Sequence, residues 1–136
     1  MQHTYSWGPR SASFWMAALI ALGISFIGLR FLFMPQVAAP AFGIDLPAGS
    51  PLLYGLIKGI RDLFSGLVLT YLLWTRNLRV TLVVFSLACL IPMTDGLTIW
   101  LANGPKDVQH LCIHWGTAAY GLVTSALMLR SWHRQA

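Results

Sequence analysis

The sequence contains no glutamate, and charged residues of any kind are scarce. Its 136 residues include four acidic side chains, all aspartate, and charged residues make up 10% of the chain, whereas about a quarter is usual in soluble domains. Hydrophobic residues make up 57%. Because so little polar surface cannot coat a soluble globule, the composition predicts an integral membrane protein, in a bacterial inner membrane or the endoplasmic reticulum, whose solvent is the lipid bilayer.

Cysteine and the known cofactor motifs are also nearly absent. Cys89 and Cys112 fall at different estimated depths in two apolar segments, and a disulfide would need their Cα atoms within about 7 Å. We therefore expect two free, buried thiols. The chain has no G-x-G-x-x-G, P-loop, haem-attachment or nucleophile-elbow motif, so we expect no cofactor.

The net charge of +5 does not indicate a nucleic-acid partner. The basic residues stand at the ends of apolar segments rather than in one stripe, which is typical of topology signals. One side of the predicted membrane carries Arg10, Arg76, Arg79, Arg130 and Arg134, and the other carries Lys106 next to Asp107. Positively charged loops favour the cytoplasm, so we expect both termini to be cytoplasmic.

Four long apolar segments account for most of the chain. A membrane-spanning helix needs about 20 mostly apolar residues, and the qualifying segments are residues 12–34, 52–74, 78–101 and 108–129. A Pro- and Gly-rich connection at residues 35–51 is the only long one. The predicted fold is all-α: an integral membrane, antiparallel four-helix bundle that forms a single domain over residues 1–136.

Ionisable residues inside these segments are the most informative feature, because each costs about 2.5–3.5 kcal/mol at the bilayer centre. A rise of about 1.5 Å per residue places all of them in the non-cytoplasmic half of the membrane. The estimated depths below that surface are roughly 14 Å for Arg61 and Asp62, 10 Å for Asp95, 9 Å for His114 and 6 Å for Arg30. Such clustering predicts a polar pocket in that half.

Helical spacing brings further polar residues to the same faces. Lys58, Arg61 and Asp62 share a stripe with Tyr54, and His110 lies one turn from His114. Pro92 removes an amide near Asp95 and can open that helix locally. The expected substrate-binding residues are Tyr54, Lys58, Arg30, His110 and Thr98.

Two carboxylates and an arginine in a desolvated cleft favour acid–base catalysis. An Asp close to Arg61 would stay ionised and activate water, while a less well paired Asp would stay protonated and donate to a leaving oxygen. The expected catalytic residues are Asp62, Asp95, Arg61 and His114. The chemistry fits hydrolysis, isomerisation or cyclisation of a lipophilic small molecule. Epoxide opening is the sharpest version, by analogy with the Asp–Arg–Asp residue types of limonene-type epoxide hydrolases.

The HxxxH spacing of His110 and His114 can bind zinc on a helix. No HExxH motif or cysteine pair accompanies it. We therefore predict no metal site.

The order of motifs resembles a known family. It runs FMPQVAAPAFGI, then YGLIKGIRDLFSGL, then DGL, then HWGTAAYG. This order is similar to the small four-helix membrane proteins grouped as domain of unknown function 4267, over nearly the whole chain. The resemblance implies that Arg61, Asp62, Asp95 and His114 match the family's polar motifs. It also implies an enzyme, since some fungal relatives are associated with polyketide and terpenoid biosynthesis, where membrane hydrolases and cyclases act on epoxides.

Two other kinds of protein fit the same residues. The first is a binding or transport protein for a small anion or a proton, since Arg30, Lys58, Arg61, Asp62 and Asp95 sum to a charge of +1. The second is a structural subunit in which Lys58 pairs with Asp62, Asp95 pairs with Arg61, and His114 bonds a backbone carbonyl. Small residues along the helices allow a tight bundle or a homodimer equally well.

Overall fold

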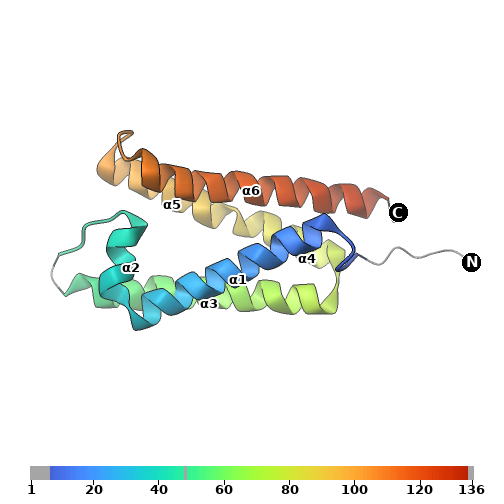
Figure 1. The fold of residues 1–136 in the computed structure, drawn as a ribbon, viewed down its shortest axis with the longest axis horizontal. Helices are drawn as coiled ribbons and strands as arrows, with labels where there is room; N and C mark the ends of the chain where they lie inside the picture. The colour runs from blue at the N-terminus through green and yellow to red at the C-terminus, as the bar shows by residue number, and fades with distance from the viewer. Residues whose placement is uncertain (1–6, 48, 135–136) are drawn as a thin grey trace, which may run out of the picture.

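In the computed structural model, residues 7–47 and 49–134 are described (Figure 1). The outermost residues of the predicted domain, 1–6 and 135–136, and Ala48 lie outside the described residues. Over the described ranges the chain is all-α, without strands. The helical segments are α1 (Ala12–Phe33), α2 (Pro35–Phe42), α3 (Ser50–Thr75), α4 (Leu78–Ala88), α5 (Leu90–Asn103) and α6 (Val108–His133).

Local chemistry explains where the helices begin and end. Pro35 follows the end of α1 and is the first residue of α2. The fixed φ of proline suits this first helical position. Gly43 ends α2 with a φ of +101°, in the left-handed region that glycine adopts without steric cost. The side chain of Asn77 caps α4, and that of Asp107 caps α6, each by accepting a hydrogen bond from a first-turn amide.

α4 and α5 follow each other with a single break at Cys89. Pro92 lacks the N–H that would bond the carbonyl of Ala88 four residues earlier, so the ladder is interrupted there. The interruption expected from Pro92 is therefore present. It lies at Cys89, N-terminal to Asp95 in the chain.

The closest helix crossing joins α1 to α3. A Cβ atom added at Gly28 would lie 2.9 Å from the carbonyl oxygen of Gly59, and one added at Gly59 would lie 3.0 Å from the carbonyl oxygen of Gly28. The two backbones touch at this point, which only glycine permits. α5 and α4 pack against α6 on the other side of the molecule, and α2 packs on α3.

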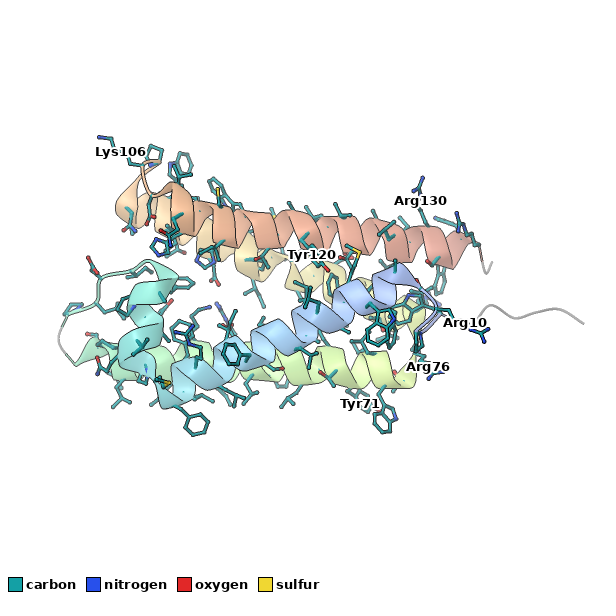
Figure 2. All side chains as sticks on the ribbon, viewed as in Figure 1. Arg10, Tyr71, Arg76, Lys106, Tyr120 and Arg130 are labelled. Atoms are coloured by element: carbon teal, nitrogen blue, oxygen red, sulfur yellow. The ribbon has the colours of Figure 1, made fainter. Side chains whose placement is uncertain are left out.

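Both described ends of the chain lie at the same end of the molecule as the α3–α4 turn (Figure 1). Arg10, Arg76 and Arg130 project there, while Lys106 lies at the opposite end (Figure 2). We call the first the arginine end. The grouping of arginines expected from the sequence is thus present in three dimensions.

Among the described residues, two helical stretches are long and apolar enough to cross a membrane: Ala12–Phe33, and Leu78–Asn103 counted through the break at Cys89. Only 22% of the most apolar window in each is buried inside the molecule. Their apolar side chains therefore face outward, as lipid-facing helices require and as the core helices of a soluble protein do not.

Two features differ from the sequence-based expectations. The connection at residues 35–51 contains a helix, α2, which buries Ala38, Ala39 and Phe42. Cys112 is exposed on α6 rather than buried, while Cys89 is buried, and both thiols are free. The prediction that Cys112 is buried was wrong, because this position of α6 faces away from the neighbouring helices.

Candidate functional site

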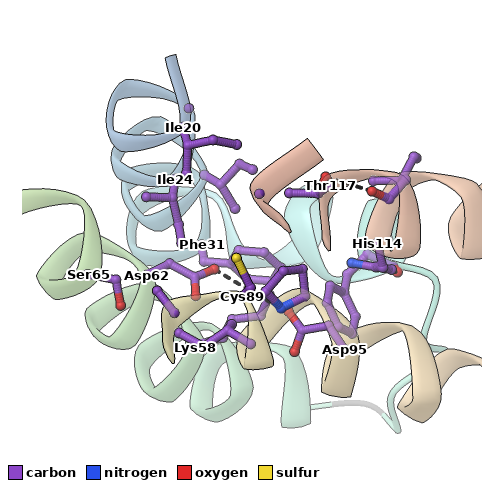
Figure 3. A pocket seen from close by; sticks show the side chains of 18 of the residues that line it. Ile20, Ile24, Phe31, Lys58, Asp62, Ser65, Cys89, Asp95, His114 and Thr117 are labelled. Atoms are coloured by element: carbon purple, nitrogen blue, oxygen red, sulfur yellow. Dashed lines mark hydrogen bonds and ion pairs between the residues drawn. The ribbon is translucent and has the colours of Figure 1, made fainter. Parts of the chain in front are cut away.

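A partly open cavity of about 380 Å³ lies between the helices (Figure 3). Its wall combines residues from all six helices. The polar residues of the wall gather at the end of the cavity opposite the arginine end. They include Arg30, Lys58, Asp62, Asp95 and His114. The cavity therefore coincides with the polar pocket expected from the sequence.

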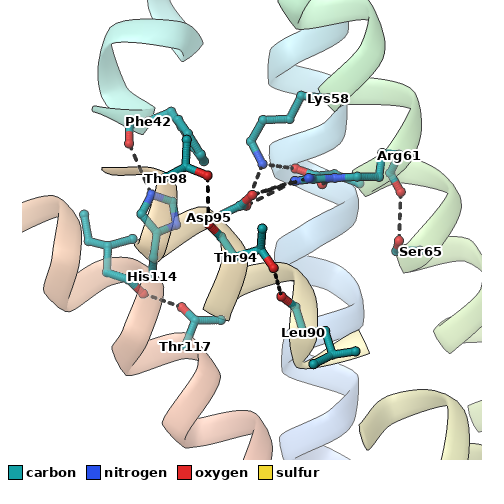
Figure 4. Close-up of polar contacts among 12 residues, drawn as sticks. Phe42, Lys58, Arg61, Ser65, Leu90, Thr94, Asp95, Thr98, His114 and Thr117 are labelled. Carbon is teal, nitrogen blue, oxygen red and sulfur yellow. Dashed lines mark hydrogen bonds and ion pairs between the residues drawn. The ribbon is translucent and has the colours of Figure 1, made fainter. Parts of the chain in front are cut away.

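Four charged side chains from two helices form one network beside this cavity (Figure 4). We call Lys58, Arg61, Asp62 and Asp95 the ion-pair cluster. The Lys58 ammonium donates to Asp62 at 2.9 Å and to Asp95 at 3.1 Å. Arg61 donates from Nε to Asp62 at 2.9 Å and from Nη2 to Asp95 at 3.1 Å. Each carboxylate thus contacts both cations.

This symmetry differs from the division that we expected between a well-paired and a poorly paired aspartate. What separates the two carboxylates is exposure, since the side chain of Asp62 is 2% exposed and that of Asp95 is 13% exposed. Arg61, with a side chain 40% exposed, closes the cluster from outside. Both carboxylates line the cavity, and Asp62 is the more deeply buried of the two.

Aromatic rings hold Lys58 from the other side. Its ammonium lies 4.6 Å from the centre of the Phe42 ring and 5.2 Å from that of Phe31, which is cation–π distance. The two rings themselves meet edge to face at 6.3 Å. Lys58 is thereby fixed at the cavity wall by two carboxylates and two aromatic faces.

His114 enters the cavity from α6. Its Nε2 lies 3.1 Å from the backbone carbonyl oxygen of Phe42. Because a carbonyl only accepts hydrogen bonds, Nε2 carries the proton, and in a neutral ring Nδ1 then keeps a basic lone pair. No hydrogen bond to Nδ1 is present among the described residues.

Three residues that we expected at the site lie elsewhere. His110 is held by Asp107, with Nδ1 2.7 Å from a carboxylate oxygen. Thr98 is exposed and donates to the carbonyl of Thr94 in its own helix. Tyr54 packs on the rings of Phe31 and Phe42 behind the cavity wall. Helical spacing predicted which face of its helix each residue occupies. It did not predict the partner that each side chain contacts instead of the cavity.

Asp107 belongs to this neighbouring cluster rather than to the cavity. Its carboxylate accepts hydrogen bonds from the amide of Asn103 and from His110. The Asn103 bond first, and then the His110 bond, hold the pKa of Asp107 below the usual value of an aspartate. Asn103 also donates to the carbonyl of Gly43 at 2.6 Å, so this cluster ties α5 to the end of α2.

Phe42 is the functional candidate that sequence reasoning missed. It supplies one aromatic face to Lys58 and the carbonyl for His114. The available signal was the P-x-x-x-x-x-x-F-G stretch at residues 35–43, with Pro at a helix start and Gly just past its end. Pro40 inside this stretch concealed the helix.

A family model for a domain of unknown function, DUF4267, matches residues 21–128. The chain belongs to the DUF4267 family. The resemblance expected from the motif order is therefore confirmed. The DUF4267 region contains every residue of the ion-pair cluster, together with Arg30, Phe42 and His114. No curated protein and no solved structure matches the chain.

Within the described residues, no group of three or more His, Cys, Asp or Glu side chains is arranged as metal ligands. His110 and His114 are occupied by separate partners, Asp107 and the Phe42 carbonyl.

Proposed function

We propose that this protein is a small integral-membrane enzyme that performs acid–base chemistry on a lipophilic small molecule, with epoxide hydrolysis or epoxide-opening cyclisation as its sharpest form. One observation carries the proposal. Aspartates from two helices bind the same lysine and arginine beside a cavity that also exposes His114. Ionisable groups gathered around a cavity within apolar helices are by default a functional site.

The proposed topology is a four-helix bundle that crosses the membrane with α1, α3, the α4–α5 stretch and α6. The two most apolar of these have their outer faces exposed. The arginine end supports cytoplasmic termini by the positive-inside rule. In this orientation the cavity's polar end lies toward the non-cytoplasmic half, as for an enzyme whose substrate dissolves in the bilayer.

The proposed roles follow from what each group can donate or accept. The Lys58 ammonium has a third N–H beyond the two that Asp62 and Asp95 accept. It donates its proton to the epoxide oxygen as the ring C–O bond breaks, with the positive charge of Arg61 beside it. Nδ1 of His114 takes the proton from the attacking oxygen as the new C–O bond forms, and solvent returns that proton from His114 to Lys58. Asp62 and Asp95 orient the donors.

The test is turnover of lipophilic epoxides by the purified protein in lipid nanodiscs, in water enriched in ¹⁸O. Hydrolysis places ¹⁸O in a diol, whereas cyclisation or isomerisation gives a product without it. We expect His114→Gln to lower turnover by about 10²-fold, the usual contribution of a positioned base. Asp95→Asn should lower turnover too, because the Lys58 proton donor loses one of its two orienting carboxylates. Thr98→Val is the control, because its side chain is exposed and bonds only its own helix. Wild-type protein without turnover of any epoxide would refute the epoxide version.

A structural role is the second candidate, because every charge of the ion-pair cluster already has partners of opposite sign. In that case Asp95→Asn would lower the unfolding temperature and change no reaction. In an enzyme, Asp95→Asn would lower turnover as well as stability, whereas His114→Gln, which lies outside the ion-pair cluster, would lower turnover and keep the fold.

A further inference from the structure

The cavity has a polar end and a long apolar end. Lining residues continue from the charges toward the arginine end along every long helix: from Arg30 to Leu19 in α1, from Asp62 to Leu69 in α3, and from His114 to Gly121 in α6. At about 1.5 Å per residue these stretches extend roughly 10–16 Å. Ile20, Ile24 and Cys89 line this part (Figure 3). Such a shape fits a single polar group followed by an apolar chain.

The cavity opens sideways between α1 and α6 along much of its length. Lining residues that are also exposed on the outer surface come from α1, α2 and α6 alone, and they are Leu19, Gly23, Ile27, Ala41, Ile113 and Thr117. The lining residues of α3, α4 and α5 are buried or half-buried. A ligand therefore reaches the cavity from the surface that faces lipid.

The charge at the polar end is unbalanced. The ion-pair cluster sums to zero, with two cations and two carboxylates in mutual contact. Arg30 also lines the cavity, and no ion pair reaches it from residues 7–47 and 49–134. One positive charge is left to meet the ligand, and arginine is well shaped to bind a carboxylate.

We propose that the ligand is a single-chain lipophilic acid, which enters between α1 and α6 with its chain along Ile20 and Ile24 and its acidic head on Arg30. This inference rests on the proposed function, for which it names the substrate class. The bond that reacts then lies just below the head, beside Lys58 and His114. A neutral lipophile lacks the group that Arg30 binds.

The experiment is photolabelling in nanodiscs with two matched reagents, dodecanoic acid and dodecanol, each carrying a diazirine at the end of its chain. The acid should label peptides that contain Ile20 or Cys89, mapped by mass spectrometry. Arg30→Gln should lower labelling by the acid at least about tenfold, as expected for a lost hydrogen bond to a charged group, and should leave labelling by the alcohol unchanged. Arg30→Lys should restore part of the difference.

A matched pair of glycines tests the opening. A Cβ atom at Gly23, in the cavity wall, and one at Gly116, outside it, each meets nothing within 4 Å. Gly23→Leu should reduce labelling by both reagents, and Gly116→Leu should reduce neither.

Equal labelling by the acid and the alcohol would overturn the acidic head. Labelling confined to outward-facing side chains such as Leu22 and Phe26 would overturn the cavity as the binding site. Because labelling needs no turnover, either result leaves the acid–base proposal to its own test, and loss of turnover in Asp95→Asn with labelling retained would support both.

Discussion

At the arginine end the helices pack through apolar side chains, with Phe85 and Met128 fully buried among Trp7, Leu73 and their neighbours. At the other end a second apolar cluster around Phe31, Phe42 and Ile99 surrounds buried charge. The first half assembles chiefly through complementary apolar packing. The second half needs each cation and carboxylate in place, because a buried charge without its partner is costly.

The difference between the two halves indicates which contacts stabilise the fold and which residues are candidates for function. In a bilayer, apolar side chains gain little by leaving lipid, so close packing and polar contacts decide how helices associate. The apolar half relies chiefly on packing, with isolated hydrogen bonds such as the one from Trp7 to Ser13. The charged half adds a network whose two acidic members come from α3 and α5, and it encloses a cavity where packing would otherwise be dense.

The largest effect should come from Asp62→Ala, which breaks the charged half. It leaves Lys58 and Arg61 with Asp95 as their remaining carboxylate partner, and loss of one partner from a buried ion pair costs about 3–5 kcal/mol. The measurement is the free energy of unfolding in mixed micelles. Asp45→Ala, at an exposed loop position, is the control. A loss below about 1 kcal/mol would mean that the cluster adds no stability.

Gly28→Leu should be next, because it forces α1 away from α3. Its side chain would meet backbone atoms of Gly59 and Leu63, and the expected loss is about 3 kcal/mol by overpacking. Gly23→Leu, in the same helix but with open space around its Cβ, should change stability little. Equal losses for the two variants would contradict the close crossing.

Phe42→Leu should cost about 2 kcal/mol, the value of a desolvated cation–π contact, because the Lys58 ammonium loses one of its aromatic faces. Phe26→Leu is the matched control, since that ring faces outward. The comparison is made by thermal unfolding of both variants. This comparison separates the contribution of the aromatic rings to the stability of the charged half from the contribution of the carboxylates.

The smallest effect should be a pH dependence at Asp107. Its pKa is lower in the folded protein than in the unfolded chain, so its contribution to stability is present above the usual aspartate value of about 3.9 and is lost as the pH falls through the folded value. The unfolding temperatures of the wild type and Asp107→Asn should therefore differ at about pH 6 and converge toward about pH 3. A constant difference would contradict this account.

The sequence predicted the positions of the long helices and the level along them at which the charges meet. Asp62, Asp95 and His114 were brought to one level by counting residues from the helix ends, because the rise per residue is nearly constant. That argument holds for any straight helix and needs no knowledge of the neighbours.

What the sequence did not predict depends on contacts between distant segments. Phe42 and His114 are 72 residues apart, and no local pattern pairs them. Thr98 and His110 were placed by periodicity, which gives the face of a helix but not the rotation of that face toward the cavity. His110 instead bonds Asp107, three residues away, and Thr98 bonds the carbonyl of Thr94, four residues away.

The opening between α1 and α6 has fixed ends. On one side the hydroxyl of Tyr120 in α6 donates to the carbonyl of Met16 in α1 at 3.4 Å. On the other, α2 is held to α6 by the bond from His114 to Phe42. For the proposed ligand, these two contacts limit how far α1 and α6 can separate, so a linear chain should pass through the opening more readily than a fused ring system of the same mass.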